Sequence, residues 1–195
     1  MNGLSAYSVE RRDRLRTGTR VLLALMLCVP AGRASGADEE PAREAAVKAA
    51  YVYRLSSYVS WPAPQRASSG PLVIGTLNAP DVHDELLQLL PGRKVEGRDI
   101  ELRSLREDEA PAGAHLIFVG RGASPKPATW QKLAKSPGLL VVTEQPDGLA
   151  QGGAINFVRV AGRVRFEAAP DAAERNGVKL SARLLAVAER VALAP

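Results

Sequence analysis

Apolar residues recur at helical spacing between Pro41 and Val59, and small residues fill the opposite side of the same segment. We expect a helix that ends at Trp61, because Pro62 disfavours helical geometry in the residue before it. The apolar side is predicted to pack on a sheet, and it holds Val47, Tyr51, Val52, Leu55, Tyr58 and Val59. The opposite side holds Ala46, Ala49, Ala50, Ser56, Ser57 and Ser60, with Tyr53 as its large residue.

Farther along the chain, apolar runs alternate with short amphipathic segments. The runs predict strands at 71–77, 99–105, 115–119, 138–143, 154–160 and 163–168. The amphipathic segments predict helices at 82–90, 127–134, 172–176 and 181–193, the last with Ser181 as its N-cap. Strands that alternate with helices pair in parallel, whereas the last two strands form an antiparallel hairpin. We therefore expect an α/β fold: a three-layer sandwich with a mixed, mostly parallel sheet of about six strands and a C-terminal hairpin and helix.

The first 37 residues differ in composition from the rest of the chain. An arginine-rich stretch precedes the apolar run 21–29, and Ser35-Gly36-Ala37 places small residues before an acidic stretch. This order is typical of a secretory signal peptide that is cleaved after Ala37. A retained membrane anchor is the alternative, although about 18 apolar residues are normally needed to span a bilayer. We expect a cleaved leader at 1–37 and a single exported domain at 38–195.

The net charge of +5 comes mainly from the leader, which holds six of the 26 basic residues and two of the 21 acidic ones. The rest of the chain is nearly balanced, which argues against a nucleic-acid partner. Cys28 is the chain's one cysteine and would leave with the leader. The exported domain would then have neither a disulfide nor a thiol nucleophile.

Residues that could carry chemistry are few and scattered. His83 and His115 lie far apart and have no metal-ligand spacing to a second His or a Cys, so no metal site is expected. No nucleophile elbow occurs. Glu144, Asp147 and Glu167 are carboxylates near strand ends, but spacing alone does not show that two of them converge. The loop 120–124 follows a buried strand, where α/β folds place ligands, but it lacks a dinucleotide fingerprint. We predict no catalytic residue and no cofactor, and we keep Gly120, Gly122 and Ser124 as a candidate ligand loop.

Several motifs together resemble the YfiR-like family of exported bacterial proteins over Ala46 to Val191. They are KAAYVY (48–53), VSWP (59–62), PLVIGTL (71–77), KVEGRDIEL (94–102), AHLIFV (114–119), GGAINF (152–157), GRVRFE (162–167) and LSARLL (180–185). The resemblance implies an α/β sandwich and a periplasmic repressor that holds an inner-membrane diguanylate cyclase inactive by binding its periplasmic sensor region. It also implies structural roles for the motif residues Trp61, Pro62, Asn156, Phe157, Phe166, Glu167 and Ser181.

The chain departs from the family pattern in three respects. Ala168-Ala169 follows Glu167 where relatives carry a branched apolar residue and an Asn, and Leu180-Ser181-Ala182 stands where Ile-Ser-Ser is usual. Relatives that sense redox state do so with cysteines, which the segment after the leader lacks. A thiol-disulfide switch is therefore excluded.

Two hypotheses of function follow. The first is a non-catalytic periplasmic regulator that binds a membrane sensor protein, such as a diguanylate cyclase or a sensor kinase. The second is a periplasmic small-ligand-binding module that uses the carboxyl edge of the sheet around 120–124 and 144–148. Under the first, the small-residue face with Tyr53, Ala49, Ala50 and Ser57 is the expected contact with a partner or with a second copy of the chain, because Tyr is favoured at interfaces.

Overall fold

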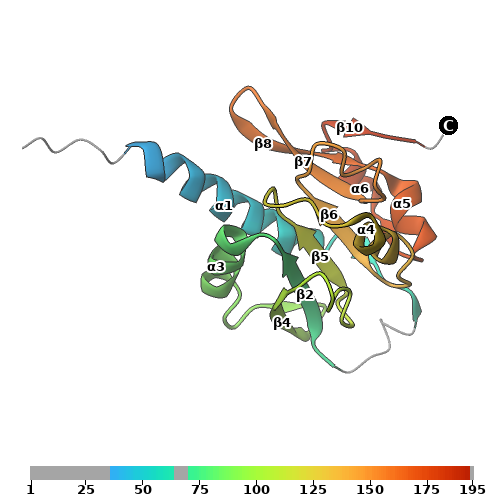
Figure 1. The fold of residues 1–195 in the computed structure, drawn as a ribbon. Helices are drawn as coiled ribbons and strands as arrows, with labels where there is room; N and C mark the ends of the chain where they lie inside the picture. Colours follow the sequence, from blue (N-terminus) through green and yellow to red (C-terminus); the bar gives the residue numbers. More distant parts are fainter. Residues whose placement is uncertain (1–35, 64–69, 194–195) are drawn as a thin grey trace, which may run out of the picture. The chain divides into compact units, whose positions relative to one another are not determined.

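Eight strands form one sheet with the order β10-β8-β7-β6-β5-β2-β4-β3, whose longer strands are labelled in Figure 1. A separate two-stranded sheet joins β1 to β9. The computed structural model describes residues 36–63 and 70–193. The strands are β1 (Val59–Ser60), β2 (Leu72–Leu77), β3 (Lys94–Val95), β4 (Arg98–Leu105), β5 (Leu116–Val119), β6 (Leu140–Thr143), β7 (Ile155–Val160), β8 (Arg163–Ala168), β9 (Lys179–Leu180) and β10 (Arg190–Val191). The helices are α1 (Gly36–Leu55), α3 (Pro80–Leu89), α4 (Pro127–Ala134), α5 (Pro170–Arg175) and α6 (Ala182–Leu185).

The predicted fold class is confirmed, with eight strands in the sheet rather than about six. Strands β4, β2, β5, β6 and β7 run parallel, while β3 pairs with β4, and β8 with β7, in antiparallel fashion. The two additional strands, β3 and β10, have only two residues each. Such short strands have no periodicity that a sequence pattern could reveal.

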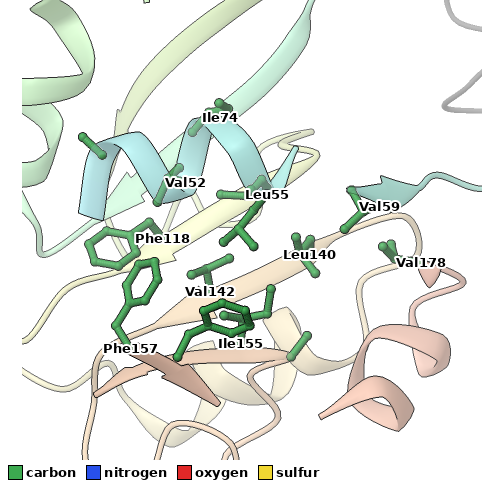
Figure 2. Close-up of a cluster of buried hydrophobic side chains, with 14 of the residues drawn as sticks. Val52, Leu55, Val59, Ile74, Phe118, Leu140, Val142, Ile155, Phe157 and Val178 are labelled. Atoms are coloured by element: carbon green, nitrogen blue, oxygen red, sulfur yellow. The ribbon is translucent and has the colours of Figure 1, made fainter. Parts of the chain in front are cut away.

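The sheet is covered on both faces, and its central strands β2, β5 and β6 are mostly apolar and buried at every position. One face packs on α1 and α3, and Figure 2 shows Val52 and Leu55 of α1 directed toward Phe118, Leu140 and Val142. The other face packs on α4 through Ile117, Val141, Trp130 and Leu133, which form a second buried cluster. The two clusters are the interfaces between the sheet and the helix layers on either side of it, as expected for three layers.

The predicted helix 41–61 is shorter at its C-terminal end than expected. Helix α1 ends at Leu55, and β1 then pairs with β9 through Val59 and Leu180. The hydroxyl of Ser56 donates to the carbonyl oxygen of Val52, at 3.2 Å. Serine side chains that bond to nearby backbone favour helix ends, and the β-branched Val59 fits a strand.

The predicted inward face of this helix is also wrong in part. Ala49 is 1% exposed and faces the sheet, whereas Val47 and Tyr58 are 42% and 41% exposed. The buried side runs through Ala45, Lys48 and Ala49 toward Val52. Small side chains on this face fit where the helix packs on the sheet, and Lys48 is accommodated because its charge is paired, as described below.

The predicted helix 181–193 is wrong beyond its first turn. Ser181 caps α6 as expected, with its hydroxyl oxygen accepting from the backbone N–H of Leu184 at 3.3 Å. The chain then leaves the helix, and the Glu189 N–H donates to the Phe166 oxygen at 2.8 Å. Strand β10 thereby extends the sheet, because pairing with the edge of β8 competes successfully with a weak helical pattern.

The predicted signal peptide lies, except for its last two residues, outside the described part of the chain, as do residues 64–69 of the predicted polar loop. Within residues 36–63 and 70–193, none of the helices has the length and apolar character needed to cross a membrane.

Candidate functional site

The direction of chain connections reverses between β2 and β5. Strand β2 is followed by β4 on one side, and β5 then returns to the other side of β2. In open α/β sheets, ligands bind outside the carboxyl ends of the strands at such a reversal. The loops that leave these two ends are 78–79, before α3, and 120–126, before α4, so this edge is where a site is expected.

The two loops lie in direct contact. A Cβ atom added to Gly120 would lie 2.4 Å from the Asn78 carbonyl oxygen, and one added to Gly122 would lie 3.0 Å from the same atom. The amide nitrogen of Asn78 also donates to the Ala123 oxygen at 2.7 Å. In this structure, the two glycines of the candidate ligand loop allow the loops to approach each other. Ser124 lies elsewhere, at an apolar hollow of about 590 Å³ beside Trp130.

A buried ion pair lies at the carboxyl end of β6. Lys48 of α1 is 5% exposed, and its ammonium nitrogen lies 2.5 Å from Glu144 Oε2 and 2.5 Å from Glu44 Oε1. The second oxygen of Glu144 accepts from the backbone N–H of Arg121 at 3.0 Å. A backbone N–H that could receive an anion at this strand end is therefore already bound to the chain's own carboxylate.

Two arginines extend this pair into a network. Arg159 of β7 donates to Glu44 at 2.8 Å and to Glu40 at 2.6 Å, and Arg121 Nη2 lies 3.7 Å from Glu144. A hollow of about 400 Å³ lies among these groups. We call it the charged crevice, and it is lined by Glu40, Pro41, Glu44, Lys48, Asp81, Arg121, Glu144 and Arg159. Its charges of opposite sign bond mainly to one another.

The network keeps Glu44 ionised. Burial by itself would raise the pKa of Glu44, but the hydrogen bond and charge of Lys48, with the charges of Arg159 and Arg121, outweigh burial and leave that pKa below its ordinary value. Helix α1 is thus held to β6 through Lys48 and to β7 through Glu44 at physiological pH.

Hydrogen bonds of the neighbouring residues Thr143, Gln145 and Asn156 hold the backbone around Glu144 in place. Thr143 Oγ1 accepts from the Gln145 N–H at 3.0 Å, and the Gln145 side chain donates to the Gly120 oxygen. With its amide nitrogen turned toward them, Asn156 donates to the carbonyl oxygens of Thr143 and Gln145, both at 3.1 Å. The motif residue Asn156 therefore fixes the backbone on both sides of Glu144.

The predicted contact face around Tyr53 is only partly on the surface. Ala49 is buried, which overturns the expectation that it faces outward, whereas Ser57 is exposed and Ala50 is half-buried. Tyr53 is half-buried: its hydroxyl donates to the Lys94 oxygen at 3.4 Å, and the Arg93 guanidinium lies 5.2 Å from the ring centre. Contacts within the chain thus account for part of the Tyr53 surface.

The motif residues lie mostly in the core. Phe157 and Phe166 are buried and contact Tyr51, with ring centres 5.6 and 6.0 Å away. Trp61 is buried with its ring edge-on to His115, and Pro62 lies near Gly177. Glu167 accepts from Arg190 at 2.7 Å and so joins β8 to β10.

The sequence interpretation missed Lys48, Glu44 and Arg159, although it noted Glu144 as a carboxylate near a strand end. Glu44 and Lys48 have the i, i+4 spacing of a helical ion pair, and Lys48 lies beside the small residues Ala45 and Ala49. A lysine within a stripe of small residues could have indicated a buried, charge-paired side chain. Among residues 36–63 and 70–193, no group of three or more potential ligands is placed to hold a metal ion.

Comparison with known proteins identifies the family. The model of the YfiR/HmsC-like family matches residues 45–189, which is most of the chain, and the chain belongs to this family. No curated protein matches the chain.

Proposed function

We propose that this member of the YfiR/HmsC-like family is a non-catalytic periplasmic signalling regulator. It binds the periplasmic sensor region of an inner-membrane protein, a diguanylate cyclase or a sensor kinase, and restrains its output. The family match over residues 45–189 is the observation that carries this proposal.

The charged crevice gives separate support. In many parallel-sheet enzymes the strand ends at the reversal of connections hold the substrate. In this chain, Lys48 and Glu144 lie beside these ends, directly after the neighbouring strand β6, and are bonded to each other, with side chains 6% and 4% exposed. A catalytic acid or base must reach its substrate, so this buried pair suits a structural role in a binding protein better than a role in catalysis.

A regulator of this kind acts by shifting a population. It binds the inactive arrangement of its partner more tightly than the active one, and a signal weakens that preference. A hundredfold difference in affinity corresponds to about 2.7 kcal/mol, which a small interface can supply.

The apolar hollow beside Ser124 supports a second candidate, a small-ligand-binding module. Its lining includes Pro125, Pro127 and Trp130, with Gln131, Lys135 and Gln151 as polar members, and it measures about 590 Å³, within the ordinary range for small-ligand sites. A metabolite panel in a thermal-shift assay tests this candidate, because a ligand at a hundredfold excess over its Kd stabilises the fold by about 2.7 kcal/mol. No shift with any compound would argue against it.

The regulator is tested by expressing the full chain with a carboxyl-terminal tag, crosslinking intact cells and identifying captured proteins by mass spectrometry. We expect one inner-membrane protein with a periplasmic region. Deleting the gene for the chain should then raise that partner's output, measured as cyclic-di-GMP for a cyclase. A chain that is exported in good yield but captures no membrane protein would contradict the proposal.

A further inference from the structure

The outer edge of β8 is only partly covered. Strand β10 pairs with β8 at Glu167 and Ala168 alone. The chain beyond β10 continues past Ala168, away from Arg163, and the segment before β10 contacts β8 through the Glu189 N–H, which donates to the Phe166 oxygen. No strand pair joins that segment to Arg163, Val164 or Arg165 in the described part of the chain. On the other side, β7 pairs with β8 along its whole length, from Val160–Arg163 to Ile155–Ala168. The first half of β8 therefore has a partner on one side only.

The backbone at this edge is directed outward. The carbonyl oxygens of Phe166 and Ala168 accept from Glu189 and Ala192 on the side away from β7. Backbone groups in an antiparallel pair alternate between the two sides, so Val164 shares this direction. Within the described part of the chain, the Val164 N–H and carbonyl oxygen form no hydrogen bond on that side. Such an edge can accept another strand.

Two arginines without acidic partners flank Val164. Arg163 and Arg165 are exposed, and neither forms an ion pair with any residue in 36–63 or 70–193. Arg159 on the neighbouring strand differs, since Glu40 and Glu44 neutralise it. This half of β8 thus carries uncompensated positive charge beside free backbone groups.

A groove of about 380 Å³ lies between α1 and the β7–β8 hairpin. Val47 and Val164 are the apolar part of its lining, and the rest is Glu40, Arg43, Glu44, Arg159, Gly162, Arg163 and Arg165. Val47 is 42% exposed despite its apolar side chain. In Figure 1, α1 passes below this hairpin. A strand added to β8 would alternate its side chains between this groove and the arginines.

A second copy of the chain is a poor occupant. Two β8 edges that pair in antiparallel fashion would bond through their outward backbone groups, on Val164 and Phe166. Pairing Val164 with Phe166 of the other copy places the two Arg165 residues opposite each other. Pairing Val164 with Val164 places Arg165 opposite Arg163. Like charges directly opposite each other destabilise strand pairs. An acidic segment has the complementary charge and avoids this repulsion.

We propose that β8 binds an extended acidic segment of a partner protein by strand addition at Val164. Arg163 and Arg165 bind the carboxylates of this segment, and its apolar side chains pack in the groove at Val47. This inference rests on the proposed function, for which it names the contact surface.

A defined peptide tests the surface directly. The probe is acetyl-(Glu-Val)₃-amide, compared with acetyl-(Lys-Val)₃-amide, and the readout is the set of backbone amide chemical shifts of the isotopically labelled, purified chain. We expect saturable shifts centred on Val164 and Phe166 with the acidic peptide only. Because the contact is charge-assisted, raising the salt concentration should weaken it. No saturable shift, or equal shifts with both peptides, would overturn the inference.

Variants separate the contributions of charge and backbone. R163E/R165E should weaken the acidic peptide by about tenfold or more, whereas the control R54E/R183E makes the same change in net charge at two exposed sites and should bind as the wild type does. V164P removes the edge N–H, and proline is tolerated on an edge strand; it should abolish binding while the fold is retained. Equal binding by R163E/R165E and the control would contradict the assignment.

The crosslinking experiment keeps the two proposals apart. If R163E/R165E captures the same membrane protein as the wild type, the surface is wrong although the regulator stands. If the acidic peptide binds at β8 but neither chain captures a membrane protein, the regulator is wrong although the surface stands.

Discussion

Replacing Lys48 by Met removes the charge at the centre of the charged crevice while keeping a long apolar stem. The variant leaves Glu144 buried, with its side chain 4% exposed, and without its closest cation. Removing one member of a buried ion pair typically costs about 3–5 kcal/mol. Arg121 still contacts Glu144 through its backbone N–H and, at 3.7 Å, through its guanidinium. We therefore expect the free energy of unfolding to fall by about 3 kcal/mol, the lower end of that range.

A double-mutant cycle isolates the pair. Glu144→Gln removes the charge but keeps an oxygen that can accept from the Arg121 N–H. In K48M/E144Q, neither member of the pair is left charged and unpaired, so the double variant should be more stable than the sum of the single effects predicts. Contacting residues of this kind couple by about 0.5–3 kcal/mol.

The assay is urea unfolding followed by circular dichroism, with equal denaturant slopes required for all variants. Lys94→Met is the matched control, because Lys94 pairs with Asp99 at 2.6 Å but both side chains are more than half exposed. Exposed pairs contribute about 0–1 kcal/mol. If K48M costs no more than K94M, or if the cycle shows no coupling, the buried pair does not hold α1 on the sheet.

Two further predictions concern His115 and Gly120. Burial, and then the charge of Arg98, lower the pKa of His115, so the folded state favours the neutral ring. The neutral ring contributes fully to the stability of the fold above the unfolded pKa of about 6.5. This contribution is lost as the pH falls from there through the folded pKa. Unfolding measured from pH 7.5 to 5.5 should show a steeper loss of stability for the wild type than for H115Q, and equal slopes would refute this. Gly120→Ala places a Cβ 2.4 Å from the Asn78 oxygen and should lower the free energy of unfolding by about 1–3 kcal/mol. Gly122→Ala should cost less, because its Cβ would lie 3.0 Å from the same oxygen. The reverse order in thermal unfolding would contradict the close approach of the two loops.

The central strands could be predicted because they are short, mostly apolar runs. Runs such as Leu116–Val119 and Leu140–Thr143 are buried on both faces, so their position does not depend on choosing a face. Helix α4 was predicted with the bounds observed, since Pro127 begins it and Trp130 and Leu133 fall on one side.

The inward face of α1 could not be predicted from hydrophobicity. A helix close to a sheet can use alanine for contact, and a lysine can be buried when distant residues neutralise it. Lys48 is 96 positions from Glu144, and Glu44 is 115 positions from Arg159. Sequence periodicity contains no information about such pairs, so the charged crevice became visible only in the folded chain. The same holds for β10, whose two residues are determined by the free edge of β8.

Helix α1 connects the charged crevice to the edge proposed to bind a partner. Glu44 bonds both Lys48 at the strand ends and Arg159 in the hairpin. The other acid on Arg159, Glu40, has a side chain 71% exposed, whereas that of Glu44 is 13% exposed. A carboxylate of a partner arriving at the hairpin would therefore replace Glu40 more readily than Glu44, because an exposed ion pair exchanges at little cost. Such an exchange leaves Lys48, Glu44 and Glu144 bonded, so a partner can bind the hairpin without loosening the packing of α1 on the sheet.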